Sequence, residues 1–204
     1  MTQHTDDVLT PTSDGLARAR SVLLAVLSVE VAVLVVTGVA LFFVYRPSMS
    51  QAWSDLLPES TDSGVRVAHA LRRIHLVASR LAMPTGLATG ILVGLSARRA
   101  GRVWPGAATG AGIAVVTFSA AFTGLLLPWD QLALWAVTVG TNLGGYEVLF
   151  GDTVRFVLIG GVQVSRGTIV RWLLVHMLLL GPALVGLVAL AWRRRSAFGQ
   201  SRVE

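Results

Sequence analysis

Two histidines lying in apolar stretches are the side chains of this sequence best suited to chemistry. His75 follows Arg72 by three residues and begins an apolar run to about Leu95, and His176 follows Arg171 by five residues at the start of another such run. Both runs are long enough to cross a bilayer, where histidine is rare and usually functional. Neutral imidazole is a common metal ligand, so the pair predicts metal or haem binding.

The composition indicates an integral membrane protein and excludes several other classes. Of 204 residues, 53% are hydrophobic and 14% charged. The absence of cysteine excludes disulfides, thiolate metal sites and haem attached through a CxxCH motif. All 17 basic residues are arginines at or near span ends, which does not predict nucleic-acid binding. The polar first twenty residues predict a flexible tail and no cleavable signal.

Four apolar segments predict an all-α, four-helix up-down bundle in the membrane. Helix is the expected structure because the bilayer core satisfies no backbone polar group. A short amphipathic helix, residues 146–159, is expected on the membrane surface between the third and fourth spans. The predicted spans are 22–44, 74–95, 107–127 and 171–192, and the predicted domains are a tail 1–20, a transmembrane domain 21–195 and a tail 196–204.

The arginine distribution predicts that both termini are cytoplasmic. The tail, the loop between the second and third spans, and the C-terminus hold nine arginines, whereas the other two connections hold seven together with six acids. In this topology the second and fourth spans begin at the same, non-cytoplasmic face. His75 and His176 should therefore lie at similar depth.

Glycines on the other two spans complete a plausible slot for a flat cofactor. Gly38 lies eight residues before Arg46, and Gly124 lies four residues before Pro128, so both should reach the depth of the histidines. Glycine lets a haem approach the backbone where a Cβ would collide. We predict that His75 and His176 bind one haem iron and that Arg72 pairs with its propionates.

The alternative is structural, because a single membrane histidine more often bonds a neighbouring helix. His69 lies six residues before His75 and is expected to be structural or solvated, and His4 belongs to the tail. The matched depth of the pair strengthens the case for metal ligation, and on the residues alone both readings stay open.

Several motifs give the chain a resemblance to a known family, the N-terminal half of cytochrome b from quinol-oxidising cytochrome bc complexes, in its split form. The similarity runs from about residue 20 to 192. It rests on Thr37-Gly38, Tyr45-Arg46-Pro47, Arg72-Arg-Ile-His75, Leu127-Pro-Trp-Asp-Gln131, Trp135 to Leu143 and Thr168 to His176. It implies axial haem ligation by His75 and His176, with Gly38, Arg72, Ser79 and Gly124 around the haem.

The resemblance also implies partners. In the family a quinol site is shared with a C-terminal half that carries a Pro-Glu-Trp-Tyr motif, which this chain lacks. The expected partners are a subunit like that C-terminal half, a Rieske iron-sulfur protein, a c-type cytochrome, membrane lipid and a second copy of the chain. Quinone is a candidate ligand at the shared site, and no catalytic residue is predicted in this chain alone.

The chain departs from the family at the second haem. The family has a further histidine about fourteen residues after each of the first two, roughly 21 Å along a helix. Here those positions hold Thr89 and Leu190 or Ala191, and Leu24 replaces the matching glycine of the first span, while Gly110 is kept. We therefore predict one haem b. At the vacant position we favour closure of the helices over a cavity that holds lipid or quinone.

Other readings remain open. Glu30 and Arg80 are charges within spans and are expected to pair with each other or with a partner subunit. The chain could be the haem anchor of another dehydrogenase or hydrogenase. It could also be a haem-free scaffold that only packs against partner helices.

Overall fold

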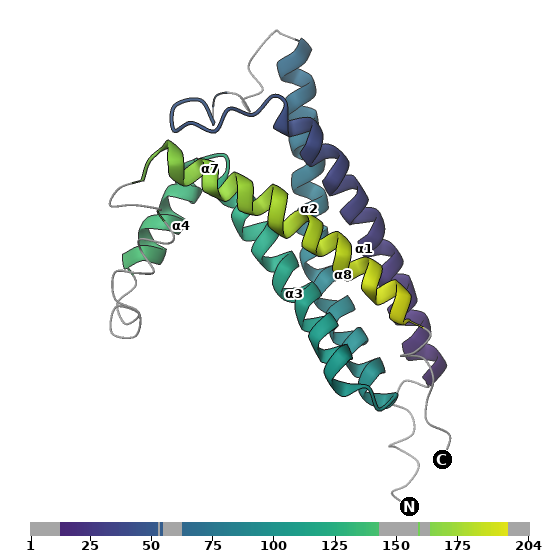
Figure 1. Ribbon diagram of the computed structural model, residues 1–204. Helices are drawn as coiled ribbons and strands as arrows, with labels where there is room; N and C mark the ends of the chain where they lie inside the picture. The colour runs from purple at the N-terminus through teal and green to yellow at the C-terminus, as the bar shows by residue number, and fades with distance from the viewer. Residues whose placement is uncertain (1–12, 53, 55–62, 143–158, 160–163, 196–204) are drawn as a thin grey trace, which may run out of the picture. The chain divides into compact units, whose positions relative to one another are not determined.

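The computed structural model describes residues 13–52, 54, 63–142, 159 and 164–195. Throughout these residues the regular secondary structure is helical (Figure 1). Four helical segments are long and apolar enough to cross a membrane: Gly15–Phe42, Ser63–Arg99, Val103–Leu126 and Arg166–Arg194. The predicted all-helical membrane fold with four spans is confirmed.

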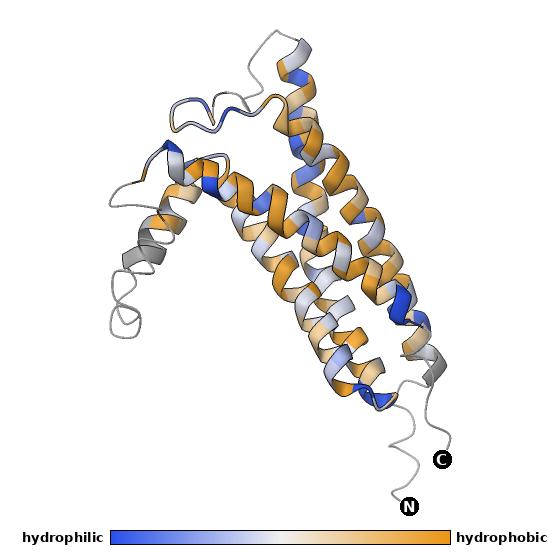
Figure 2. Cartoon of the chain, in the orientation of Figure 1, coloured by the Kyte–Doolittle hydropathy of each residue, from blue (hydrophilic) through white to orange (hydrophobic). Residues whose placement is uncertain are grey.

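The first three spans are single helices whose ends follow local sequence signals. They are α1 (Ser13–Phe42), α2 (Ser63–Arg99) and α3 (Val103–Leu126). Helix α2 ends on Arg98 and Arg99, and Gly101 makes the turn into α3 with a φ of 70°, which glycine adopts without strain. Figure 2 shows hydrophobic residues along the helices and hydrophilic bands where α2 and α8 end.

The fourth span is an α-helix interrupted by a π-helical turn. Helix α7 (Arg166–Leu174) continues as a π-helical turn, η2 (Val175–Leu180), and then as α8 (Gly181–Arg194). Pro182 has no N–H to donate, and in an α-helix its ring would collide with the carbonyl four residues earlier. The wider π turn, in which Gly181 N–H bonds to His176 O, accommodates this proline.

The chain divides into two compact units, each with parts of all four spans. The first, called here the packed unit, comprises residues Met1–Ala32, Ala78–Phe118 and Ala183–Glu204. The second, called here the histidine unit, comprises Val33–Val77 and Ser119–Pro182. Both of the paired histidines lie in the histidine unit.

In the packed unit, contacts between neighbouring helices close a ring of four. Trp192 of α8 donates through Nε1 to Ser28 Oγ of α1 at 2.8 Å, and Thr85 of α2 donates to Glu30 of α1 at 3.2 Å. Helix α8 is tied to α3 by Arg194 Nη1, 3.0 Å from Thr109 Oγ1. The remaining contact, between α2 and α3, runs through glycines.

In the histidine unit, the loops beyond the spans are fixed by an apolar cluster. Helix α4 (Gln131–Asn142) follows α3 after a sharp turn at Trp129, whose φ of 50° is unusual for a non-glycine residue. The Trp129 side chain packs on a cluster of four buried residues, Leu126, Ala133, Val137 and Ile159. Asp130 accepts a hydrogen bond from Ala133 N at 2.9 Å and so caps α4.

The surface helix predicted at 146–159 lies outside the described residues except for Ile159. The structure does contain a helix between the third and fourth spans, α4, but it begins directly after Asp130. The sequence did not predict α4, because the segment after Asp130 mixes polar and apolar residues and a helix was expected only in its later part, 146–159.

Candidate functional site

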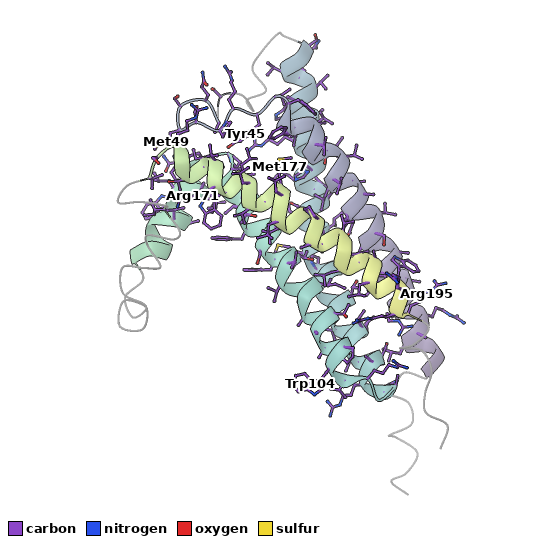
Figure 3. All side chains as sticks on the ribbon, in the orientation of Figure 1. Tyr45, Met49, Trp104, Arg171, Met177 and Arg195 are labelled. Atoms are coloured by element: carbon purple, nitrogen blue, oxygen red, sulfur yellow. The ribbon has the colours of Figure 1, made fainter. Side chains whose placement is uncertain are left out.

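His75 of α2 and His176 of η2 face each other in the histidine unit. Their ring centres are 6.3 Å apart, and the rings are inclined by 61°. Met177, labelled in Figure 3, follows His176 within the same π turn. The shared depth predicted from the arginines therefore corresponds to direct proximity of the two imidazoles.

Each imidazole is held by a threonine hydroxyl on another helix. Thr37 Oγ1 of α1 lies 2.8 Å from His75 Nδ1, and Thr123 Oγ1 of α3 lies 2.9 Å from His176 Nδ1. Each hydroxyl also lies close to a carbonyl one turn earlier, at 2.7 Å for Val33 O and 2.9 Å for Ser119 O.

These contacts occupy Nδ1 of each ring and favour one arrangement of the protons. A hydroxyl has one proton, and in the arrangement in which each threonine donates it to the carbonyl, its oxygen accepts from the ring. In that arrangement both histidines carry their proton on Nδ1. Nε2 of each ring is left with its lone pair, the form in which imidazole binds a metal ion.

A glycine follows each threonine and lies against the same imidazole. A Cβ built on Gly38 would lie 3.3 Å from His75 Cε1, and one built on Gly124 would lie 3.1 Å from His176 Cε1. A side chain at either position would press on the ring. The two glycines predicted from the sequence thus lie beside the two histidines, each against one ring.

The residues present fit a haem held by two axial histidines. Two imidazoles on opposite sides of one metal ion, with metal–nitrogen distances of about 2 Å, have ring centres about 6 Å apart. The observed 6.3 Å matches this separation. Among the described residues no group of three or more histidines or carboxylates could hold a metal ion by itself, so a ligand set of two imidazoles calls for a macrocycle to supply the rest.

Arg72 and Ser79, the polar residues also predicted for this site, differ in their surroundings. Arg72 is half-buried in the histidine unit, where its charge is attracted by Asp130. It is therefore available to an anionic group only in competition with that carboxylate. Ser79 lies one helical turn after His75 on α2 but belongs to the packed unit, and its role stays a prediction.

Thr37 and Thr123 contact the paired histidines, although neither was predicted from the sequence to be a site residue. The signal was present, since the dipeptide Thr-Gly occurs at both Thr37-Gly38 and Thr123-Gly124, before the end of the first and third spans. The repeat places equivalent hydroxyls beside the two rings.

The packed unit holds the positions of the family's second haem, and there the helices meet directly. Leu24 and Thr89 are 1% and 0% exposed. A Cβ on Gly90 or on Gly110 would collide with the backbone carbonyl of the other glycine. Gly110, the glycine kept from the family pattern, thus packs α3 against α2. This agrees with the predicted closure of the helices.

Glu30 is not paired with Arg80 in the way that the sequence suggested. Its Oε1 accepts from Thr85 Oγ1 at 3.2 Å, while Oε2 is buried without a hydrogen-bond partner. Arg80 is exposed on α2. The Thr85 hydroxyl, five residues after Arg80, contacts Glu30 in place of the expected ion pair.

Comparison with known proteins places the chain in a family. The sequence matches the family described as cytochrome b/b6/petB over residues 15–192. It is 32% identical to cytochrome b6 of Porphyra purpurea over 149 residues, covering 72% of this chain and 67% of that protein. It is 31% identical to cytochrome b of Bugula neritina over 157 residues, covering 76% and 41%.

The solved structures show the same fold. A chain of a structure named "Hyperthermophilic respiratory Complex III" superposes with a TM-score of 0.69 at 23% identity, over 87% of this chain and 48% of that one. The chain thus spans about two thirds of the cytochrome b6 relative and about half of the complex III chain. The family match extends from α1 to α8 and includes both histidines, and the chain belongs to the cytochrome b/b6 family.

Proposed function

We propose that this protein is a membrane electron-transfer subunit of a bc-type respiratory complex and carries one haem b between His75 and His176. The family, and relatives named cytochrome b6 and respiratory Complex III, support the electron-transfer role. The observation that carries the haem assignment is the facing pair of imidazoles, each with Nδ1 occupied by a threonine.

The surrounding residues have separate tasks in this proposal. His75 and His176 would hold the haem iron through their Nε2 nitrogens, and the Thr37 and Thr123 hydroxyls would hold the rings and make them more basic by accepting from Nδ1. Gly38 and Gly124 leave the rings room, and Arg72 would pair with the haem propionates. When bound, the haem takes up and releases one electron at a potential set by its ligands and its burial.

The packed unit supports the proposal of a single haem per chain. No histidine occurs at Thr89, Leu190 or Ala191, and a planar cofactor would have to separate the backbones that touch at Gly90 and Gly110. Separating them would expose residues that now fill the interior, among them Leu24 and Ile113. An electron route through a second haem is therefore interrupted in this subunit.

Further parts of the proposal come from the sequence and the relatives. Both termini are cytoplasmic, which puts the haem near the non-cytoplasmic face. The chain acts as a transmembrane haem domain (21–195) between tails 1–20 and 196–204. Its partners are a subunit corresponding to the C-terminal half of cytochrome b, a Rieske protein or a c-type cytochrome, with quinol oxidised at a shared site.

A reduced-minus-oxidised absorbance spectrum of the purified chain, with haem quantified per chain, tests the proposal. We expect a b-type α-band and one haem. Absence of the band in protein that was expressed with haem would favour the haem-free scaffold. Co-purification with a dehydrogenase or hydrogenase, and without a Rieske protein or c-type cytochrome, would favour the haem-anchor role.

A further inference from the structure

The packed unit contains a buried arginine that the haem proposal does not use. Arg20 of α1 is 4% exposed, and its Nη2 donates to the backbone carbonyl of Arg195 at 2.8 Å. Its Nε and Nη1 are buried and have no hydrogen-bond partner. These two nitrogens carry three of the five N–H donors of a guanidinium group.

The charged side chain that acts on Arg20 is a second cation, Arg195. Arg195, which directly follows α8 (Figure 3), is exposed and repels Arg20 electrostatically. Its guanidinium carbon lies 4.9 Å from the centre of the Trp192 ring, and Trp192 is bonded to Ser28 of α1. Within residues 13–52, 63–142 and 164–195, no carboxylate pairs with Arg20. Among the described residues, the end of α8 therefore brings the charge of Arg195 close to Arg20 of α1 without a counter-ion.

This arrangement calls for an anion. A buried cation with unsatisfied donors is strongly unfavourable unless an anion compensates its charge. Arg20 lies five residues inside the first apolar segment and Arg195 one residue beyond the last, so both lie near the ends of spans. This is the depth of lipid headgroups, and guanidinium groups match phosphate in geometry and charge.

We propose that Arg20 and Arg195 form a site for the phosphate group of an anionic phospholipid. Arg20 supplies the buried donors, and the exposed side chain of Arg195 moves to admit the phosphate and then adds a second positive charge. The bound lipid compensates the charge of Arg20 and fastens the end of α8 to α1.

Lipid retention by the full-length, haem-loaded protein tests this site. The protein is reconstituted in phosphatidylcholine bilayers with or without phosphatidylglycerol, and the lipid that stays bound is counted by native mass spectrometry. We expect preferential retention of phosphatidylglycerol, about tenfold weaker in Arg20→Gln. Arg195→Gln should lose part of the preference. Arg98→Gln, which removes an exposed arginine at the end of α2, should retain it.

Each other outcome overturns the proposal. Equal retention by the wild type, Arg20→Gln and Arg195→Gln would show that these arginines bind no lipid. An equal loss in Arg98→Gln would indicate a general effect of surface charge. If inorganic phosphate raised the thermal midpoint of lipid-free protein in detergent as much as phosphatidylglycerol does, the site would belong to a free anion. Should Arg20→Gln not fold, Arg195→Gln decides, because that side chain is exposed.

Discussion

The histidine unit and the packed unit use glycine in opposite ways. In the histidine unit, Gly38 and Gly124 each lie against an imidazole ring, and the preceding threonine holds that ring. In the packed unit, Gly90 and Gly110 lie against each other and bring two backbones into contact. A missing Cβ thus admits a ligand ring where a histidine is present and a neighbouring helix where none is. The side chain opposite each glycine decides which of the two occurs.

Removal of either histidine should give the largest effect. We expect His75→Ala and His176→Ala each to lose the haem α-band, since one remaining imidazole leaves the iron half-ligated. The absorbance spectrum of the purified variants measures this. His69→Ala, on the same helix, is the control and should keep the band. Unchanged spectra in both site variants would remove the axial assignment.

Alanine substitutions at Gly110 and Gly124 should have different effects in the two units. Gly110→Ala places a Cβ against the Gly90 carbonyl and should lower the free energy of unfolding by about 1–3 kcal/mol, as overpacking does. Haem content per folded chain should stay the same. Gly124→Ala should instead alter the haem spectrum, because its Cβ presses on His176. Thermal unfolding in detergent and absorbance spectra measure the two effects, and a spectral change confined to Gly110→Ala would contradict the comparison.

Loss of the threonine hydroxyls should have a smaller effect on the same site. Thr37→Val or Thr123→Val keeps the shape but removes the acceptor for Nδ1–H, which makes the ring a weaker ligand. We expect haem affinity to fall about tenfold and the potential to rise, since a less basic imidazole stabilises the oxidised iron less. Redox titration checks the direction. Thr117→Val in the packed unit is the matched control and should leave the potential unchanged, whereas an equal shift there would argue against a local effect.

Glu30→Gln should change least. Glutamine keeps the contact with Thr85 and removes only a carboxyl that has no charged partner in the described structure. We expect the unfolding free energy to change by less than about 0.5 kcal/mol and haem content to stay the same. Chemical unfolding of Glu30→Gln and Arg80→Gln tests this prediction. A large and equal loss of unfolding free energy in both variants would support the ion pair that the sequence suggested.

Much of the fold could be predicted from the sequence because the bilayer limits the choices. The length of the apolar segments and the arginines at their ends were sufficient to predict the four spans. The spacing of His75 and His176 from arginines was sufficient to predict that the two histidines lie close together. The π turn could not be predicted, because it depends on how the backbone accommodates Pro182. The partner of Glu30 depends on the rotation of α1 against α2, which apolar periodicity does not define. The role of Gly110 was hidden because a glycine that admits a cofactor and one that admits a helix look alike in sequence.

Haem counted per chain by a pyridine haemochrome assay, on purified protein of known concentration, tests the central claim most directly. A ratio of one is expected, because in the described part of the chain the histidine unit alone brings two imidazoles face to face. A ratio of two would contradict the account, since it would require a second pair of ligands where Thr89 and Leu24 are now packed.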